Sequence, residues 1–274
     1  SFDAAAAKFI ELVDADPQHK FADKALNNAA VAFEKTRRFE SATNTYERLY
    51  RDHPQSELAQ TALYRVGVNS ERAEKTLRQL YRPLTAKDVP LLVTSCEAAE
   101  VIKYAANTFL ATRIAFVNQL ADLCEKVGAD IKDVSKGMGM DGRIGNKFLH
   151  AGPGYGGSCF PKDTKALARI GQEYAVPMQI TETVIKVNEE IKRRMLDKII
   201  DLCDGSVNGK TIGVLGVTFK PNTDDMRDAP SLTIVPALVG SGAQVRVCDP
   251  KGRREGEALL PGVTWLEDPY QAAA

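Results

Sequence analysis

Hydrophobic positions recur at helical spacing through most of the chain. In residues 1–68 the pattern also repeats, because a small, an aromatic and a proline position return after a shift of 37 residues. The positions concerned are Ala5, Phe9 and Pro17, followed by Ala42, Tyr46 and Pro54. Small and large apolar residues at these intervals let two antiparallel helices approach closely, and a proline ends the second helix. The segment is predicted to form helical hairpins.

The same segment resembles the tetratricopeptide repeat, a helical hairpin found in protein-interaction arrays. Ala30 and Phe33 occupy its small and aromatic positions ahead of Ala42. A third unit begins near Glu57 and then loses the pattern. The alternative is a plain helical hairpin with ordinary core alanines.

From residue 69 the pattern changes. Residues 70–84 are predicted to form an amphipathic helix, and residues 89–95 a short buried strand. Apolar positions then keep helical spacing to Val127, with Ser95 as the expected N-cap and Gly128 as the end of the helix. A helix this long and apolar is typical of the spine of a domain or dimer.

The last third of the chain changes from helical to strand spacing. Helices are expected from about Asp163 and over 181–205, then a strand over 210–219, a helix over 231–242 and a strand over 243–249. These lengths predict one strand–helix–strand unit of a parallel sheet. One such unit leaves sheet edges unpaired, so we expect a shortened Rossmann-like domain.

The expected fold class is therefore mainly α with α/β. Four parts are expected: TPR-like repeats (1–68), a junction (69–94), a central helical domain (95–204) and a partial Rossmann-like domain (205–274).

Composition narrows the classes of partner. The chain has 36 basic and 36 acidic residues and no net charge, so it predicts neither a nucleic-acid nor a membrane partner. Its five cysteines are scattered without metal-ligand spacing, which predicts reduced thiols, no metal and a cytoplasmic location.

Cys159 is the cysteine with the most distinctive surroundings. It follows the glycine-rich stretch GPGYGGS and precedes Pro161, which is common at the start of a helix. A helix N-terminus and Lys162 both favour a thiolate, and Asp163 is placed to handle a proton. The pattern predicts a nucleophile that attacks a carbonyl. The alternative is a buried structural cysteine in a tight loop.

Two other polar pairs are candidates for chemistry. Lys103 and Asn107 lie one turn apart on an apolar helix, where they are costly unless paired. Lys220 follows a predicted strand and Arg227 lies in the next loop, where ligands of α/β folds bind. Solvated charges and backbone hydrogen bonds are the alternatives at all four positions.

Three stretches together resemble the UDP-glucose/GDP-mannose dehydrogenase family. They are KYAANTFLATRIAFVNQL, GMDGRIGNKFLHAGPGYGGSCFPKD and GVTFKPNTDDMRDAPSL. The resemblance runs from about Val68 onward, and the GYGGSCFPKD form fits the branch that acts on UDP-glucose or related UDP-hexoses.

The resemblance implies roles for particular residues. Cys159 is the nucleophile of a two-step, NAD-dependent oxidation of UDP-glucose to UDP-glucuronate, through a thiohemiacetal and a thioester. Lys103 stabilises the oxyanion, while Asn107 and Asp163 orient water and manage protons. Substrate contacts fall to Arg143, Phe148, Leu149, Tyr155, Gly156, Gly157, Phe160, Phe219 and Lys220. Lys162 and Arg227 contact the cofactor, and Arg143 reaches the substrate of a neighbouring subunit in a homodimer formed through the long helix.

The chain also departs from that family. We find no strand–loop–helix with the GxGxxG fingerprint for NAD and no family Asn-Pro-Glu turn, so we do not expect this chain to complete the reaction by itself. One alternative is a fused scaffold that joins TPR-like repeats, with a protein partner, to a dehydrogenase dimerisation core. Another is a UDP-sugar-binding module without chemistry.

Overall fold

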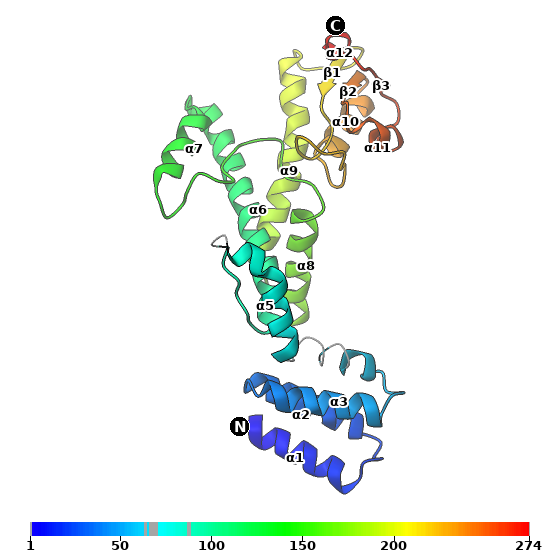
Figure 1. The fold of residues 1–274 in the computed structure, drawn as a ribbon. Helices are drawn as coiled ribbons and strands as arrows, with labels where there is room; N and C mark the ends of the chain where they lie inside the picture. The colour runs from blue at the N-terminus through cyan, green and yellow to red at the C-terminus, as the bar shows by residue number, and fades with distance from the viewer. Residues whose placement is uncertain (1, 63–64, 66–70, 87–88, 274) are drawn as a thin grey trace. The chain divides into compact units, whose positions relative to one another are not determined.

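The computed structural model describes residues 2–62, 65, 71–86 and 89–273. Its contacts divide the chain into two compact units, Ser1–Ala99 and Glu100–Ala274 (Figure 1). Helices dominate both units, and a small parallel sheet lies near the C-terminus. The mainly helical prediction is therefore confirmed, whereas the four-part division stays a prediction.

The first unit begins with three helices of equal length. These are α1 (Phe2–Ala15), α2 (Ala22–Lys35) and α3 (Phe39–Asp52), and α2 packs against both of the others. Ala30 and Ala42 are fully buried, which lets α2 and α3 approach closely. Ala5 is exposed, however, and Ala6 is the buried alanine of α1.

These helices agree with a tetratricopeptide repeat and with a plain hairpin alike, so the repeat stays a prediction. Within the expected third unit, residues 63–64 and 66–70 lie outside the described residues. The helix predicted over 70–84 is present as α5 (Glu71–Thr85).

The strand predicted over 89–95 is wrong. These residues have no regular secondary structure, and the side chain of Leu92 is 73% exposed. Short apolar runs fit a strand or a loop equally well when no neighbouring strand pairs with them.

Helices form the central part of the chain. They are α6 (Cys96–Val127), α7 (Ile131–Met140), α8 (Phe160–Glu173) and α9 (Gln179–Leu202). The predicted ends of α6 are confirmed: the Ser95 hydroxyl accepts a hydrogen bond from the Ala98 amide, and Gly128 has a φ of +73°. Ala111 and Ala115 of α6 pack with Val184 and Val187 of α9, and α8 packs beside α9.

The C-terminal part is a three-stranded parallel sheet with short helices. Along the chain it runs β1 (Thr211–Leu215), α10 (Ser231–Gly240), β2 (Gln244–Cys248), α11 (Arg253–Leu259), β3 (Thr264–Trp265) and α12 (Pro269–Ala273). The sheet order is β1-β2-β3, with Thr211 opposite Gln244 and Arg246 opposite Thr264.

Two sequence expectations for this sheet need correction. The sheet has three strands where the sequence predicts two, because a two-residue strand such as β3 shows no periodicity of its own. The first strand also ends at Leu215 rather than at residue 219, since Gly216 takes a φ of +85° and turns the chain.

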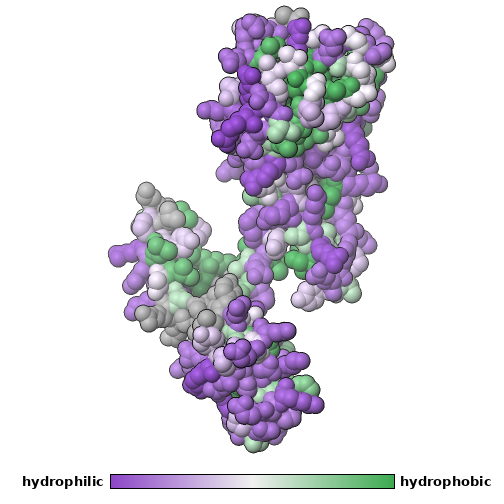
Figure 2. Space-filling model, turned by 90° about the vertical axis from the view of Figure 1, so that its right-hand side faces the viewer, coloured by the Kyte–Doolittle hydropathy of each residue, from purple (hydrophilic) through white to green (hydrophobic). Residues whose placement is uncertain are grey.

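Apolar side chains also reach the surface of the C-terminal part, at the top of Figure 2. The outward-facing Leu215 of β1 is 62% exposed, and Tyr270 of α12 is 84% exposed. In the part of the chain that the structure describes, no helix has the length and apolarity needed to cross a lipid bilayer.

Candidate active site

Cys159 lies at the N-terminal end of α8, where the sequence places it. It is the residue before the helix, its thiol is exposed, and Pro161 occupies the first turn. The helix therefore begins at Phe160, about one turn earlier than expected. The exposed thiol rules out the buried structural cysteine considered above. The Ser158 hydroxyl lies 3.7 Å from the sulfur.

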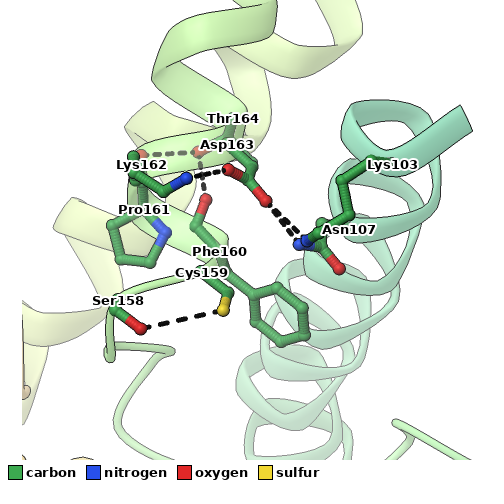
Figure 3. A network of polar contacts seen from close by, with 9 residues as sticks. All are labelled: Lys103, Asn107, Ser158, Cys159, Phe160, Pro161, Lys162, Asp163 and Thr164. Carbon is green, nitrogen blue, oxygen red and sulfur yellow. Dashed lines mark hydrogen bonds and ion pairs between the residues drawn. The ribbon is translucent and has the colours of Figure 1, made fainter. Parts of the chain in front are cut away.

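Asp163 joins this helix end to α6, as Figure 3 shows. One carboxylate oxygen, Oδ2, accepts hydrogen bonds from the Lys103 ammonium at 2.9 Å and from the Asn107 amide at 2.5 Å. The ammonium of Lys162 lies 2.8 Å from the other oxygen, Oδ1. Lys103 and Asn107 thus share Asp163 as a partner, while the Lys103 side chain is still 59% exposed.

The electrostatics of Asp163 follow from these contacts. Its side chain is only 1% exposed, and burial alone would raise the pKa of the carboxyl group. Hydrogen bonds from Lys162, Lys103 and Asn107 outweigh burial and lower this pKa from 3.8 to about 2. The same ion pair raises the pKa of Lys162, to which Cys159 makes a smaller contribution of the same sign. Asp163 is therefore a fixed negative charge at neutral pH.

The glycine loop, defined here as residues 152–157, requires its glycines for conformational and steric reasons. Gly154 and Gly157 have φ values of +104° and +83°. A Cβ on Gly156 would lie 2.4 Å from the carbonyl oxygen of Asp228, and one on Gly157 would lie 2.7 Å from the Phe219 ring. The loop therefore packs directly on the segment that precedes α10.

An aromatic cluster surrounds the start of α8. The Phe160 ring makes edge contacts with the rings of Phe148 and Tyr155, each at a centroid distance of 6.0 Å. Tyr155 and the neighbouring Leu149 are buried, and Phe148 is 37% exposed with a φ of +60°. The structure thus brings three of the predicted substrate residues, Phe148, Tyr155 and Phe160, together at the start of α8.

Three predicted residues, Phe219, Lys220 and Arg227, come from the loop after β1. The ammonium of Lys220 lies 5.2 Å from the centre of the Phe219 ring. Arg227 pairs with Asp225, whose pKa falls to about 2 because of that side-chain hydrogen bond, and the Arg227 carbonyl accepts a hydrogen bond from the Gly157 amide at 2.7 Å. Cys159 also contributes to the raised pKa of Arg227.

Arg143 is placed apart from this cluster. It lies in the loop after α7, its side chain is 89% exposed, and its guanidinium pairs with Asp141 at 2.6 Å. Its predicted role in a neighbouring subunit is not tested by a single chain.

Sequence reasoning missed two buried asparagines that hold the glycine loop. Asn118 of α6 accepts a hydrogen bond from the Gly152 amide at 2.8 Å, and Asn188 of α9 hydrogen-bonds both backbone groups of Tyr155. The signal that singled out Asn107, an amide within an apolar helical pattern, also applies to both residues.

The GxGxxG spacing by itself occurs twice in the chain, at residues 137–142 and at 152–157. The first lies at the end of α7 and the second leads toward α8, and neither follows a strand. The fingerprint binds pyrophosphate only in a strand–loop–helix turn, so these two matches do not form that site. Among the described residues no cluster of His, Cys, Asp or Glu is suited to a metal ion.

Comparison with known proteins gives a family for this arrangement. The model of the central domain of the UDP-glucose/GDP-mannose dehydrogenase family matches residues 97–190, and the model of that family's UDP binding domain matches residues 213–274. The chain carries the central and UDP-binding domains of this family. The site described above is built from both.

Individual relatives agree with this assignment. A UDP-glucose 6-dehydrogenase of Rhizobium meliloti (strain 1021) is 51% identical over 211 residues, which are 76% of this chain and 48% of that protein. A UDP-glucose dehydrogenase structure from the hyperthermophilic archaeon Pyrobaculum islandicum is 40% identical with a TM-score of 0.69, covering 74% of this chain and 46% of that one. A UDP-D-ManNAc dehydrogenase structure from Pyrococcus horikoshii is 27% identical with a TM-score of 0.57, covering 66% and 43%. The chain thus spans about half the length of these relatives.

Proposed function

We propose that residues 100–274 bind a UDP-hexose, with UDP-glucose the preferred one, and present Cys159 to its C6 carbon. The observation that carries this proposal is the exposed thiol at the start of α8, beside the network formed by Asp163, Lys103 and Asn107. About half-identity to proteins named UDP-glucose 6-dehydrogenase supports the choice of sugar.

The chemistry of these residues is addition of a thiol to a carbonyl. The Cys159 sulfur forms a bond to the C6 aldehyde, the electrons of the carbonyl π bond move to oxygen, and the proton released by the thiol neutralises the resulting oxyanion, which gives a thiohemiacetal. Lys103 supplies a cation for that oxyanion. Asp163, held ionised by its three partners, fixes Lys103 and Asn107. If an oxidant removed hydride from the thiohemiacetal to give a thioester, Asn107 and Asp163 would be placed to orient the water that hydrolyses it.

The family reaction is an NAD-dependent double oxidation from alcohol to carboxylate, and it is part of the proposal. Lys162 and Arg227 are exposed cations near Cys159 and suit a dinucleotide. The described residues do not form a strand–loop–helix phosphate site, so we derive no step through NAD.

The test uses the C6 aldehyde of UDP-glucose, which needs no oxidant. We expect it to slow labelling of Cys159 by iodoacetamide and to give a reversible adduct in native mass spectrometry. Cys159→Ala should abolish the adduct, whereas Cys203→Ala, which removes another thiol, should not. An adduct that survives in Cys159→Ala, or no adduct at all with the wild-type chain, would refute the proposal. If UDP-glucose still binds in the latter case, the chain is a UDP-sugar-binding module.

Oxidation is tested separately. Following NADH absorbance with UDP-glucose and NAD, beside the Cys159→Ala control, shows whether this chain completes the reaction by itself.

We also propose that α6 mediates a homodimer. Large apolar side chains recur every seven residues along one line of this helix: Ile102, Phe109, Phe116 and Leu123. Their exposed fractions are 49, 63, 50 and 57%, so this stripe is uncovered in the single chain. A seven-residue repeat of this kind is typical of a helix that packs against another helix.

A second candidate function is a scaffold in which the first unit binds a protein partner, fused to the dehydrogenase dimerisation core. The close packing at Ala30 and Ala42 is compatible with a tetratricopeptide hairpin, as it is with a plain helical hairpin. Binding of partner proteins by residues 1–68 in pull-down experiments, undiminished by Cys159→Ala, would support this second function.

A further inference from the structure

The glycine loop has little internal structure to hold it in place. Residues 152–157 form neither helix nor strand, and four of the six are glycines. Glycine has more conformational freedom to lose than any other residue, so a single loop conformation depends on partners outside the loop.

Asn188 of α9 makes two hydrogen bonds to the loop. Its amide oxygen accepts a hydrogen bond from the Tyr155 N–H at 2.7 Å, and its amide nitrogen donates to the Tyr155 carbonyl at 3.1 Å. The side chain is only 2% exposed, so water does not compete for either bond. One side chain thereby satisfies both backbone groups of Tyr155, as a paired strand would.

The wall formed by α9 also shapes the residue before Tyr155. A Cβ on Gly154 would lie 2.9 Å from the Asn188 amide oxygen and 3.3 Å from Cγ of Lys192, which is one turn further along α9. Asn188 therefore limits the loop sterically as well as through hydrogen bonds.

The position of Tyr155 is passed on to Cys159. The Tyr155 ring is 6% exposed and meets the Phe160 ring edge-on, with an interplanar angle of 90°. Phe160 directly follows Cys159 and is the first residue of α8. A shift of the Tyr155 backbone would move the ring that packs on the residue beside the nucleophile.

We propose that Asn188 is a positioning residue, which fixes the glycine loop and thereby the direction from which a bound sugar meets the Cys159 thiol. This inference rests on the proposed function for the thiol chemistry, whereas the hold on the loop stands independently of it. Asn188 touches no reacting atom and acts through Tyr155 and Phe160.

Hydrogen exchange tests the hold on the loop without any ligand. In Asn188→Ala the Tyr155 amide loses its acceptor, so we expect it to exchange roughly tenfold faster or more. Asn188→Asp keeps an acceptor for that amide and should preserve most of its protection. Thr181→Val changes an equally buried residue two turns earlier on α9 and should leave the loop unaffected.

The effect on the nucleophile is read by comparing two reagents. In Asn188→Ala we expect the affinity of Cys159 for the UDP-glucose C6 aldehyde to fall about tenfold or more, because that adduct needs a defined approach. The rate of alkylation by iodoacetamide, a small reagent without such a requirement, should change less than about threefold.

The possible outcomes separate the two proposals. An unchanged exchange rate of the Tyr155 amide in Asn188→Ala overturns the inference. An equal loss of aldehyde affinity and of the rate of alkylation by iodoacetamide also overturns it, because it indicates general damage to the site. If the wild-type chain forms no aldehyde adduct, the proposed function fails, while the exchange data still decide whether Asn188 holds the loop.

Discussion

At the scale of single residues, Asp163 is the centre of the site. Its buried carboxylate accepts hydrogen bonds from Lys103 and Asn107 of α6 and forms an ion pair with Lys162 of its own helix. Because its carboxyl group has a pKa of about 2 in the folded protein, against an ordinary value of 3.8, folding favours the ionised form.

The first prediction concerns the dependence of stability on pH. The depressed pKa means that the contribution of Asp163 is fully present above about pH 4 and is lost as the pH falls toward 2. It corresponds to about 2 kcal/mol, and Asp163→Asn should lower the free energy of unfolding by about that amount at pH 7. In urea titrations the difference in the free energy of unfolding between the wild type and Asp163→Asn should become smaller below pH 4. Asp141→Asn, which alters an exposed pair with Arg143, should have little effect, and a difference that stays constant to pH 2.5 would contradict the assignment.

The second prediction concerns the glycine loop. Gly157→Ala places a side chain at a φ of +83° and against the Phe219 ring, so it should destabilise the second unit by about 2–4 kcal/mol. Gly152→Ala is the matched control, since a Cβ there has no neighbour within 4 Å and its φ is not positive. Thermal unfolding of both variants is the measurement. Equal melting temperatures would show that the loop does not pack on Phe219 in solution.

The residues of the site were predictable to the extent that they share a local pattern. Spacing alone placed Lys103 beside Asn107, and the order of Cys159, Pro161 and Asp163 placed the thiol at a helix end. Asn188 was not singled out, although it too is an amide within an apolar helical pattern. That pattern marks a buried amide that needs a partner, but only the folded chain shows that the partner is Tyr155, 33 positions away.

At the scale of elements, helix ends were predicted better than strands. Ser95 and Gly128 mark α6 correctly because capping depends on neighbouring residues alone. β3 was missed and the strand over 89–95 was wrong, since a strand exists only through its partners and two to seven residues carry little periodicity.

The third prediction concerns the start of α6. Ser95→Ala removes the acceptor for the Ala98 amide and should cost about 1 kcal/mol of helix stability. Hydrogen exchange should accelerate in the first turn of α6 and fade before Asn107, about three turns into the helix. Ser95→Asp, which retains an acceptor, should restore protection. Faster exchange throughout the helix would mean that the cap is not the cause.

At the scale of the whole molecule, the chain consists of two compact units, of which the second contains the proposed site. The family of this second unit was predictable from three motifs. The function of the first unit was not predictable, because helical hairpins with buried alanines occur in proteins of many different functions. No local residue pattern identifies the partner of such a hairpin.

The fourth prediction tests the dimer proposed to form through α6. Phe116 is half exposed at the middle of the apolar stripe, so Phe116→Lys should convert a dimer into a monomer in sedimentation experiments. Phe39→Lys, an exposed aromatic residue of α3, is the control and should leave the mass unchanged. A wild-type chain that sediments as a monomer at micromolar concentration would contradict the proposal.

The hydrogen bond from the Gly157 amide to the Arg227 carbonyl has a consequence for how a ligand is used. It ties the loop beside the thiol to the domain matched as UDP-binding. Under the proposed function, binding energy from contacts to the nucleotide, far from the reacting carbon, then helps to order the segment that faces that carbon. A free sugar lacks these contacts and should react more slowly even at saturation. The nucleotide would therefore contribute to catalysis as well as to recognition.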